Sequence, residues 1–205
     1  MPKQPFEYSE NKDGQTIHIR KPSLCYLDQF VGLTCAGDLL NLKLFPNAKE
    51  ITESMAAYAA LRKRLEARLS EPLSVLVVGD GSTPRTGALI AFRSRWNVTS
   101  VDPNINPKNL NLPISRLRVC KGKVEELEYA LAPGAMDIVV AVHSHAKILP
   151  LGRLLTVEIP CCHEPMGPPS LKTEEYWDWG IHSERRQVLI YNPAAWATGG
   201  CLVAA

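Results

Sequence analysis

Five residues combine types and spacing that suit a nucleoside-containing ligand. The apolar run SVLVVG ends in Gly79, and Asp80, Gly81 and Ser82 follow it directly. Glycine lets a chain turn sharply and lets a ligand approach the backbone. Asp102 ends a second apolar run about 20 residues later, the spacing of an acidic residue that binds ribose hydroxyls. The order strand, glycine loop, helix, strand, acid therefore favours a nucleoside cofactor over a plain turn with a strand-end aspartate.

Histidines and cysteines follow two later apolar runs. His143 and His145 come after one run, and Cys161, Cys162 and His163 come after the next. In a parallel sheet these strand ends can be neighbours. A histidine titrates near neutral pH and can take a proton from a hydroxyl or amine. We therefore predict His143, and with less weight His145 and His163, as catalytic residues facing an acceptor, with burial in the core as the alternative.

The same residues allow two other interpretations. Histidine and cysteine are zinc ligands, but adjacent cysteines in an extended chain point to opposite sides, and the sequence has no C-x-x-C. We therefore predict no metal site. For the two cysteines alone, the favoured interpretation is a place in the core, because cysteine is among the residues most often buried.

Alternating strands and helices must position these residues. Apolar residues at three- or four-residue spacing predict a helix that begins after Asn47 and ends before Pro72. Beyond it we expect strands at 74–79, 97–102, 116–122, 136–144, 152–160 and 186–193, with helices at 84–95 and 123–133. This order predicts an α/β fold, a doubly wound Rossmann-like sheet, mostly parallel, with helices on both faces.

The remaining segments are less regular. Residues 1–46 are interpreted as an N-terminal arm, and 47–205 as a single globular unit. A long connection between the last two expected strands is rich in proline and aromatic residues, and long loops in compact domains are often functional. Its aromatic and polar residues could stack on a base or pack the loop onto the sheet; they are Tyr176, Trp177, Asp178, Trp179 and His182.

Composition sets broad limits. Of the 205 residues, 45% are hydrophobic and 21% charged, as in ordinary globular proteins. The net charge of +2 is too small to indicate by itself a nucleic-acid or membrane partner. The polar start carries no signal-peptide pattern, and no run approaches the length of a membrane span. We therefore expect a cytoplasmic protein without a membrane partner, whose six scattered cysteines form no disulfide framework.

The pattern VLVVGDG…VTSVDPN resembles the class I S-adenosylmethionine-dependent methyltransferases, over about residues 73–160. A full G-x-G-x-x-G and a Walker lysine are both absent. The sequence departs from the family at Val77, where an acidic residue is usual, and in a shortened glycine motif. The resemblance implies S-adenosylmethionine as cofactor, bound by Gly79, Asp80, Gly81, Ser82 and Asp102.

The resemblance also implies methyl transfer to an acceptor. The ends of the fourth and fifth expected strands look like those of an RNA-modifying subgroup, so RNA is the preferred acceptor. One alternative is a non-catalytic or partner-dependent Rossmann-like domain that has lost the acid at position 77. Another is a phosphoribosyltransferase-like enzyme, suggested by the GDGSTPRTG loop but ranked last because paired acids do not precede that loop.

Overall fold

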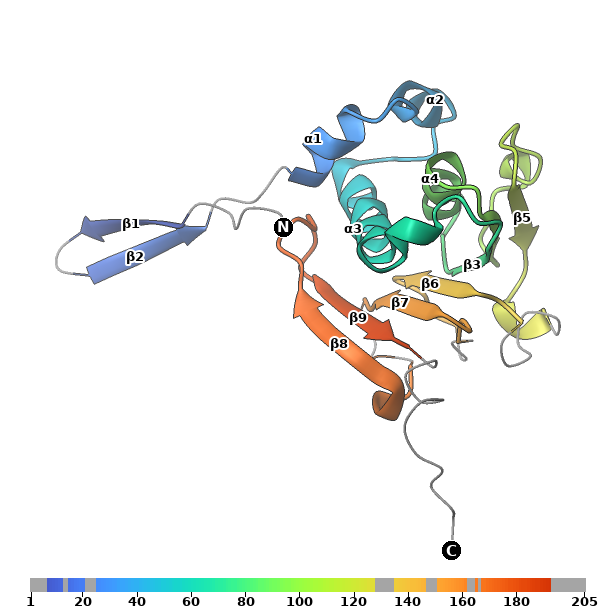
Figure 1. Cartoon of the computed structure of the whole chain (residues 1–205). Coiled ribbons are helices and arrows are strands. Elements are labelled where there is room, and N and C mark those ends of the chain that lie inside the picture. The colour runs from blue at the N-terminus through green and yellow to red at the C-terminus, as the bar shows by residue number, and fades with distance from the viewer. Residues whose placement is uncertain are drawn as a thin grey trace, which may run out of the picture.

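The computed structural model describes residues 7–12, 15–20, 25–127, 135–146, 151–161, 165 and 167–192. Within these ranges the chain forms a two-stranded sheet and a seven-stranded sheet (Figure 1). The larger sheet has the order β5-β4-β3-β6-β7-β9-β8. None of the helices in this part of the chain has both the length and the apolar composition needed to span a bilayer.

Five adjacent parallel strands make up most of the larger sheet, with β5 at its edge. They are β3 (Ser74–Val78), β4 (Asn97–Asp102), β5 (Leu117–Lys121), β6 (Ile138–Val142) and β7 (Leu155–Ile159). Strand β3 is the first of the five along the sequence. The next two, β4 and β5, lie on one side of β3, and the last two, β6 and β7, lie on its other side. This reversal between β3 and β6 is the switch point at which doubly wound sheets bind ligands. The expected Rossmann-like fold class is confirmed.

Two longer helices cover one face of this sheet. Helix α3 (Ala48–Leu65) packs on β6 and β7, and α4 (Arg85–Arg93) packs on β3, β4 and β5. The Asn47 side chain accepts a hydrogen bond from the backbone N–H of Glu50, so the expected cap of α3 is confirmed. The predicted helix at 123–133 is seen as the short 3-10 helix η3 (Val124–Glu126), and residues 128–134 lie outside the described part.

The N-terminal segment divides into two parts. Strands β1 (Glu7–Lys12) and β2 (Gln15–Arg20) pair as a hairpin that projects from the body in Figure 1. Helices α1 (Cys25–Val31) and α2 (Ala36–Asn41) instead lie against it. Phe30, Leu39 and Leu44 are buried in the same apolar cluster as α3 and α4. The segment read as an arm thus contributes side chains to the core.

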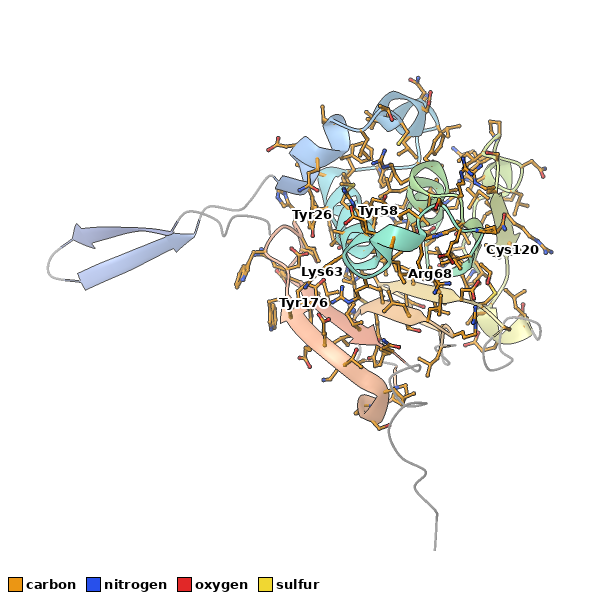
Figure 2. The ribbon with its side chains drawn as sticks, viewed as in Figure 1. Tyr26, Tyr58, Lys63, Arg68, Cys120 and Tyr176 are labelled. Atoms are coloured by element: carbon orange, nitrogen blue, oxygen red, sulfur yellow. The ribbon has the colours of Figure 1, made fainter. Side chains whose placement is uncertain are left out.

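The connection expected to be a long loop contains a strand. Strand β8 (Lys172–Trp177) pairs antiparallel with β9 (Gln187–Tyr191), which pairs antiparallel with β7. The sequence interpretation was wrong here because β8 lies at the sheet edge, where charged residues are common, and its side chains are mostly exposed. The Tyr26 hydroxyl donates a hydrogen bond to Asp178, which joins α1 to the β8–β9 connection; Figure 2 shows Tyr26 and Tyr176 on this side.

Candidate functional site

A pocket of about 500 Å³ lies at the carboxyl ends of the central strands. Its lining comes from five places: the ends of β3, β4 and β6, the segment after β5, and the start of α4. Pockets for small molecules commonly measure about 300–1,000 Å³. The lining includes Gly79, Gly81, Arg85, Asp102, Asn104, Lys123, Glu125, Glu126, His143, Ser144 and His145. Position and size therefore suit a small-molecule ligand.

The glycine turn after β3 requires its glycines. Gly79 has φ +80° and Gly81 has φ +77°, both in the left-handed region. A Cβ atom on Gly79 would lie 2.6 Å from the Cα of Ser144, which follows β6. The end of β3 and the end of β6 are thus in direct backbone contact. The turn presents backbone, with no side chain, to this part of the pocket.

Asp102 lies beside this turn, as the spacing predicted. One carboxylate oxygen accepts a hydrogen bond from the backbone N–H of Gly81 at 3.0 Å, and the other accepts from Asn104 at 2.6 Å. An ionised carboxylate can accept about four hydrogen bonds. Asp102 therefore keeps capacity for two more, which is what a ribose diol requires.

Asp80 and Ser82 are not among the residues that line the described pocket. Asp80 is 1% exposed, and its carboxylate accepts hydrogen bonds from the backbone of Thr86 and Gly87 and from the Ser100 hydroxyl. It thereby holds the first turn of α4 against β4. The carbonyl of Ser82 accepts hydrogen bonds from the backbone N–H of Asn106 and the side chain of Asn109. Both residues fix the loop through contacts within the chain.

Charged residues near the turn were missed by the sequence reasoning. Arg85, in the first turn of α4, lines the pocket and pairs with Glu50 of α3. Lys123, Glu125 and Glu126 line it from the segment after β5. Val77, at the position where the resembling family has an acid, is fully buried in the core. The sequence signal for these pocket charges was weak, because charged residues next to helix ends are common on any surface.

His143 is paired with a carboxylate from a distant part of the chain. Its Nε2 lies 2.7 Å from Oε1 of Glu53, a residue of α3 that is 1% exposed. Burial lowers the pKa of His143, but contact with the Glu53 carboxylate and its charge outweigh burial, so the pKa is raised. Burial likewise raises the pKa of Glu53, but His143 and Lys49 outweigh it, so that pKa is lowered. Each member of this buried pair thus favours the charged form of the other.

His145 lies beside a thiol. Its Nε2 is 3.0 Å from Sγ of Cys161, the residue that follows Pro160 after β7. The structure therefore brings His143, His145 and Cys161 together at one edge, as expected for neighbouring strand ends. His163 and Cys162 lie outside the described residues. Among the residues that are described, no group of three or more histidine, cysteine or acidic side chains is placed to hold a metal ion.

Comparisons with known proteins add similarities of fold. No family model and no curated protein matches the sequence. A mutant of MtNAS in complex with S-adenosylmethionine is 12% identical, with 80% of this chain and 69% of that chain covered and a TM-score of 0.46. The MycE methyltransferase of the mycinamycin biosynthetic pathway, in complex with Mg, SAH and mycinamycin VI, is 14% identical, with 89% and 62% covered and a TM-score of 0.38.

A probable spermidine synthase from Corynebacterium glutamicum is 13% identical, with 70% of this chain and 63% of that chain covered and a TM-score of 0.39. The structures to which the chain is similar thus include a methyltransferase and a protein bound to S-adenosylmethionine. At these identities and TM-scores the similarity concerns the course of the chain. The choice of ligand rests on the pocket's own residues.

Proposed function

We propose that the chain binds S-adenosylmethionine in this pocket and transfers its methyl group to an acceptor. The observation that carries the proposal is Asp102, which has two unused acceptor positions beside a turn that exposes backbone at the switch point of the sheet. A ribose diol fits such a carboxylate. Bound S-adenosylmethionine supplies a methyl carbon made electrophilic by the attached sulfonium.

Each lining group has a role in this proposal. Asp102 accepts hydrogen bonds from the ribose hydroxyls, and Gly79 and Gly81 let the ligand approach the backbone. Arg85 offers a positive charge for the cofactor's carboxylate, because it reaches the pocket from beside Gly81. Asp80 and Ser82 act indirectly, by fixing the loop. Methyl transfer needs mainly alignment of the reacting groups, so a rigid loop is itself a contribution to the reaction.

The histidines have different roles on the acceptor side of the pocket. Contact with the Glu53 carboxylate favours the protonated form of His143, so His143 is poorly suited to accept a further proton. His145 is then the better candidate to accept a proton from the acceptor. His163 remains a sequence prediction for the same edge.

RNA remains the proposed acceptor. Trp177 is 55% exposed and Trp179 is 41% exposed, and the guanidinium of Arg186 lies 5.3 Å from the ring centroid of Trp179. Exposed aromatic rings next to arginine suit base stacking. The antiparallel pairing of β8, β9 and β7 puts these residues near the carboxyl end of β7, on the side of Cys161. This placement supports a single-stranded acceptor reaching the pocket from that side.

Calorimetric titration with S-adenosylmethionine and S-adenosylhomocysteine tests the cofactor assignment. We expect micromolar affinity, weakened at least about tenfold in Asp102→Asn because an amide replaces the charged acceptor. Asp28→Asn, on an exposed position of α1, is the matched control and should bind as the wild type does. Absence of heat with both ligands in the folded wild type would overturn the proposal and favour a non-catalytic domain. Magnesium-dependent binding of phosphoribosyl pyrophosphate would instead favour the phosphoribosyltransferase alternative.

The acceptor is tested separately, with radiolabelled methyl groups. We expect label from S-adenosylmethionine to enter RNA, and Trp179→Ala to reduce this transfer without changing cofactor affinity. Label in other acceptors with none in RNA would contradict RNA as acceptor while leaving the cofactor assignment intact.

A further inference from the structure

A cluster of four side chains lies at the edge of the pocket, and the proposed function uses only part of it. Its members are Glu53 from α3, His143 and His145 after β6, and Cys161 after β7. We call these four residues the thiol cluster. Three separate segments of the chain converge there, so the tertiary fold brings these side chains together.

The cluster surrounds the Cys161 sulfur with groups that favour its ionised form. His145 Nε2, at 3.0 Å, can take the thiol proton. His143 also interacts with Cys161, and the Glu53 carboxylate 2.7 Å from His143 Nε2 favours the imidazolium form. A thiol next to imidazolium has its ionised form stabilised, and thiolate is the reactive form of cysteine.

Two other cysteines of the described part of the chain serve for comparison. Cys35 is buried in the core, and burial raises the pKa of its thiol. Cys120 is half-buried on β5, at the opposite end of the sheet from β9, as its label in Figure 2 shows. The chain therefore contains its own reference thiols, one buried and one partly accessible.

We infer that Cys161 is a nucleophilic thiol site that takes soft carbon electrophiles at the acceptor end of the pocket. The thiol proton moves to Nε2 of His145, and the sulfur electron pair forms a bond to the carbon. The leaving group departs with the electron pair of the bond that breaks, so the step needs no oxidant or reductant. The inference does not depend on which cofactor the pocket binds.

Iodoacetamide, whose iodide is the leaving group, tests the site in the full chain without added cofactor. Labelling rates of individual cysteines are followed by mass spectrometry, in a Cys162→Ser background so that the neighbouring thiol is not counted. We expect Cys161 to react at least about tenfold faster than Cys120 near pH 7, and Cys35 to react slowest. Equal rates at Cys161 and Cys120 in the wild-type fold would overturn the inference.

A variant and a pH series separate activation from simple exposure. His145→Asn should lower the Cys161 rate towards that of Cys120 and leave the Cys120 rate unchanged. The titratable groups nearest the thiol are His145 and His143 from the β6 end, with Glu53 and Lys49 behind them on α3. Their arrangement predicts that Cys161 labelling persists to lower pH than Cys120 labelling. A Cys161 profile that rises in parallel with that of Cys120, or an unchanged rate in His145→Asn, would contradict activation.

Discussion

Asp80 illustrates at the scale of a single residue how sequence position and physical role differ. It stands between the two glycines, yet its carboxylate accepts three hydrogen bonds from within the chain. We predict that Asp80→Asn lowers the free energy of unfolding by about 3 kcal/mol, because an amide replaces a charged acceptor facing buried donors. Urea unfolding measures this change. Asp28→Asn, on an exposed position, should cost less than about 0.5 kcal/mol, and equal costs for the two variants would contradict the assigned role.

The pair of Glu53 and His143 predicts a pH dependence of stability. The raised pKa of His143 gives stability that is complete below its ordinary value of 6.5 and is lost as pH rises through the folded value. The lowered pKa of Glu53 gives stability that is complete above 4.5 and is lost as pH falls. The difference in unfolding free energy between wild type and His143→Gln should therefore be largest between these two values and shrink towards alkaline pH. A difference that stays constant or grows as pH rises above 6.5 would contradict the pairing of Glu53 with His143.

The site could be predicted from sequence where its residues share one short unit of the chain or follow the ends of neighbouring parallel strands. Asp102 and the glycine turn share one strand-helix-strand unit, so their spacing carries the geometry. Glu53 meets His143 across 90 positions, and only the packing of α3 on β6 brings them together. The local indication of this role was Glu53 itself, because it is a charged residue in Thr52–Leu61, the mostly buried stretch of the amphipathic helix α3.

At the scale of elements, the turn between β3 and α4 fixes where the pocket lies. Gly79→Ala forces a side chain into a left-handed backbone and against the backbone of Ser144. We expect a loss of about 2 kcal/mol or more in unfolding free energy. Gly37→Ala in α2 is the control: its Cβ meets nothing within 4 Å, so a gain of about 0.5–1 kcal/mol is expected. Similar effects of the two substitutions on urea unfolding would contradict the tight approach of β3 to β6.

Buried strands could be predicted from the sequence better than short or exposed elements. Strand β6 is a continuous buried apolar run, and β3 is one after Ser74. Such runs next to helices are typical of strands in a parallel sheet. Strand β8 lies at the sheet edge with charged, exposed side chains, and α1 and α2 have only seven and six residues. Such short or exposed elements show too little periodicity to be recognised, because tertiary contacts determine them.

At the scale of the whole molecule, the N-terminal segment shows where the folded body begins. Phe30, Leu39 and Leu44 are at most 1% exposed and pack with α3 and α4. Burial of such side chains contributes about 1.5–3 kcal/mol each. Together these three contributions are comparable to a typical free energy of unfolding of about 5–15 kcal/mol. We therefore expect the folded body to require α1 and α2 for its stability. The hairpin of β1 and β2, in contrast, projects from the body.

This contrast predicts opposite outcomes for two truncations. A chain lacking residues 1–24 should keep its thermal midpoint and its cooperative unfolding, because an isolated two-stranded hairpin adds little stability of its own. A chain lacking residues 1–46 should unfold or lose cooperativity, since the core then loses the three apolar side chains. Thermal unfolding followed by circular dichroism distinguishes the cases. A stable chain without residues 1–46 would place the boundary of the folded unit at position 47, and a large loss on removing 1–24 would show that the hairpin belongs to the body.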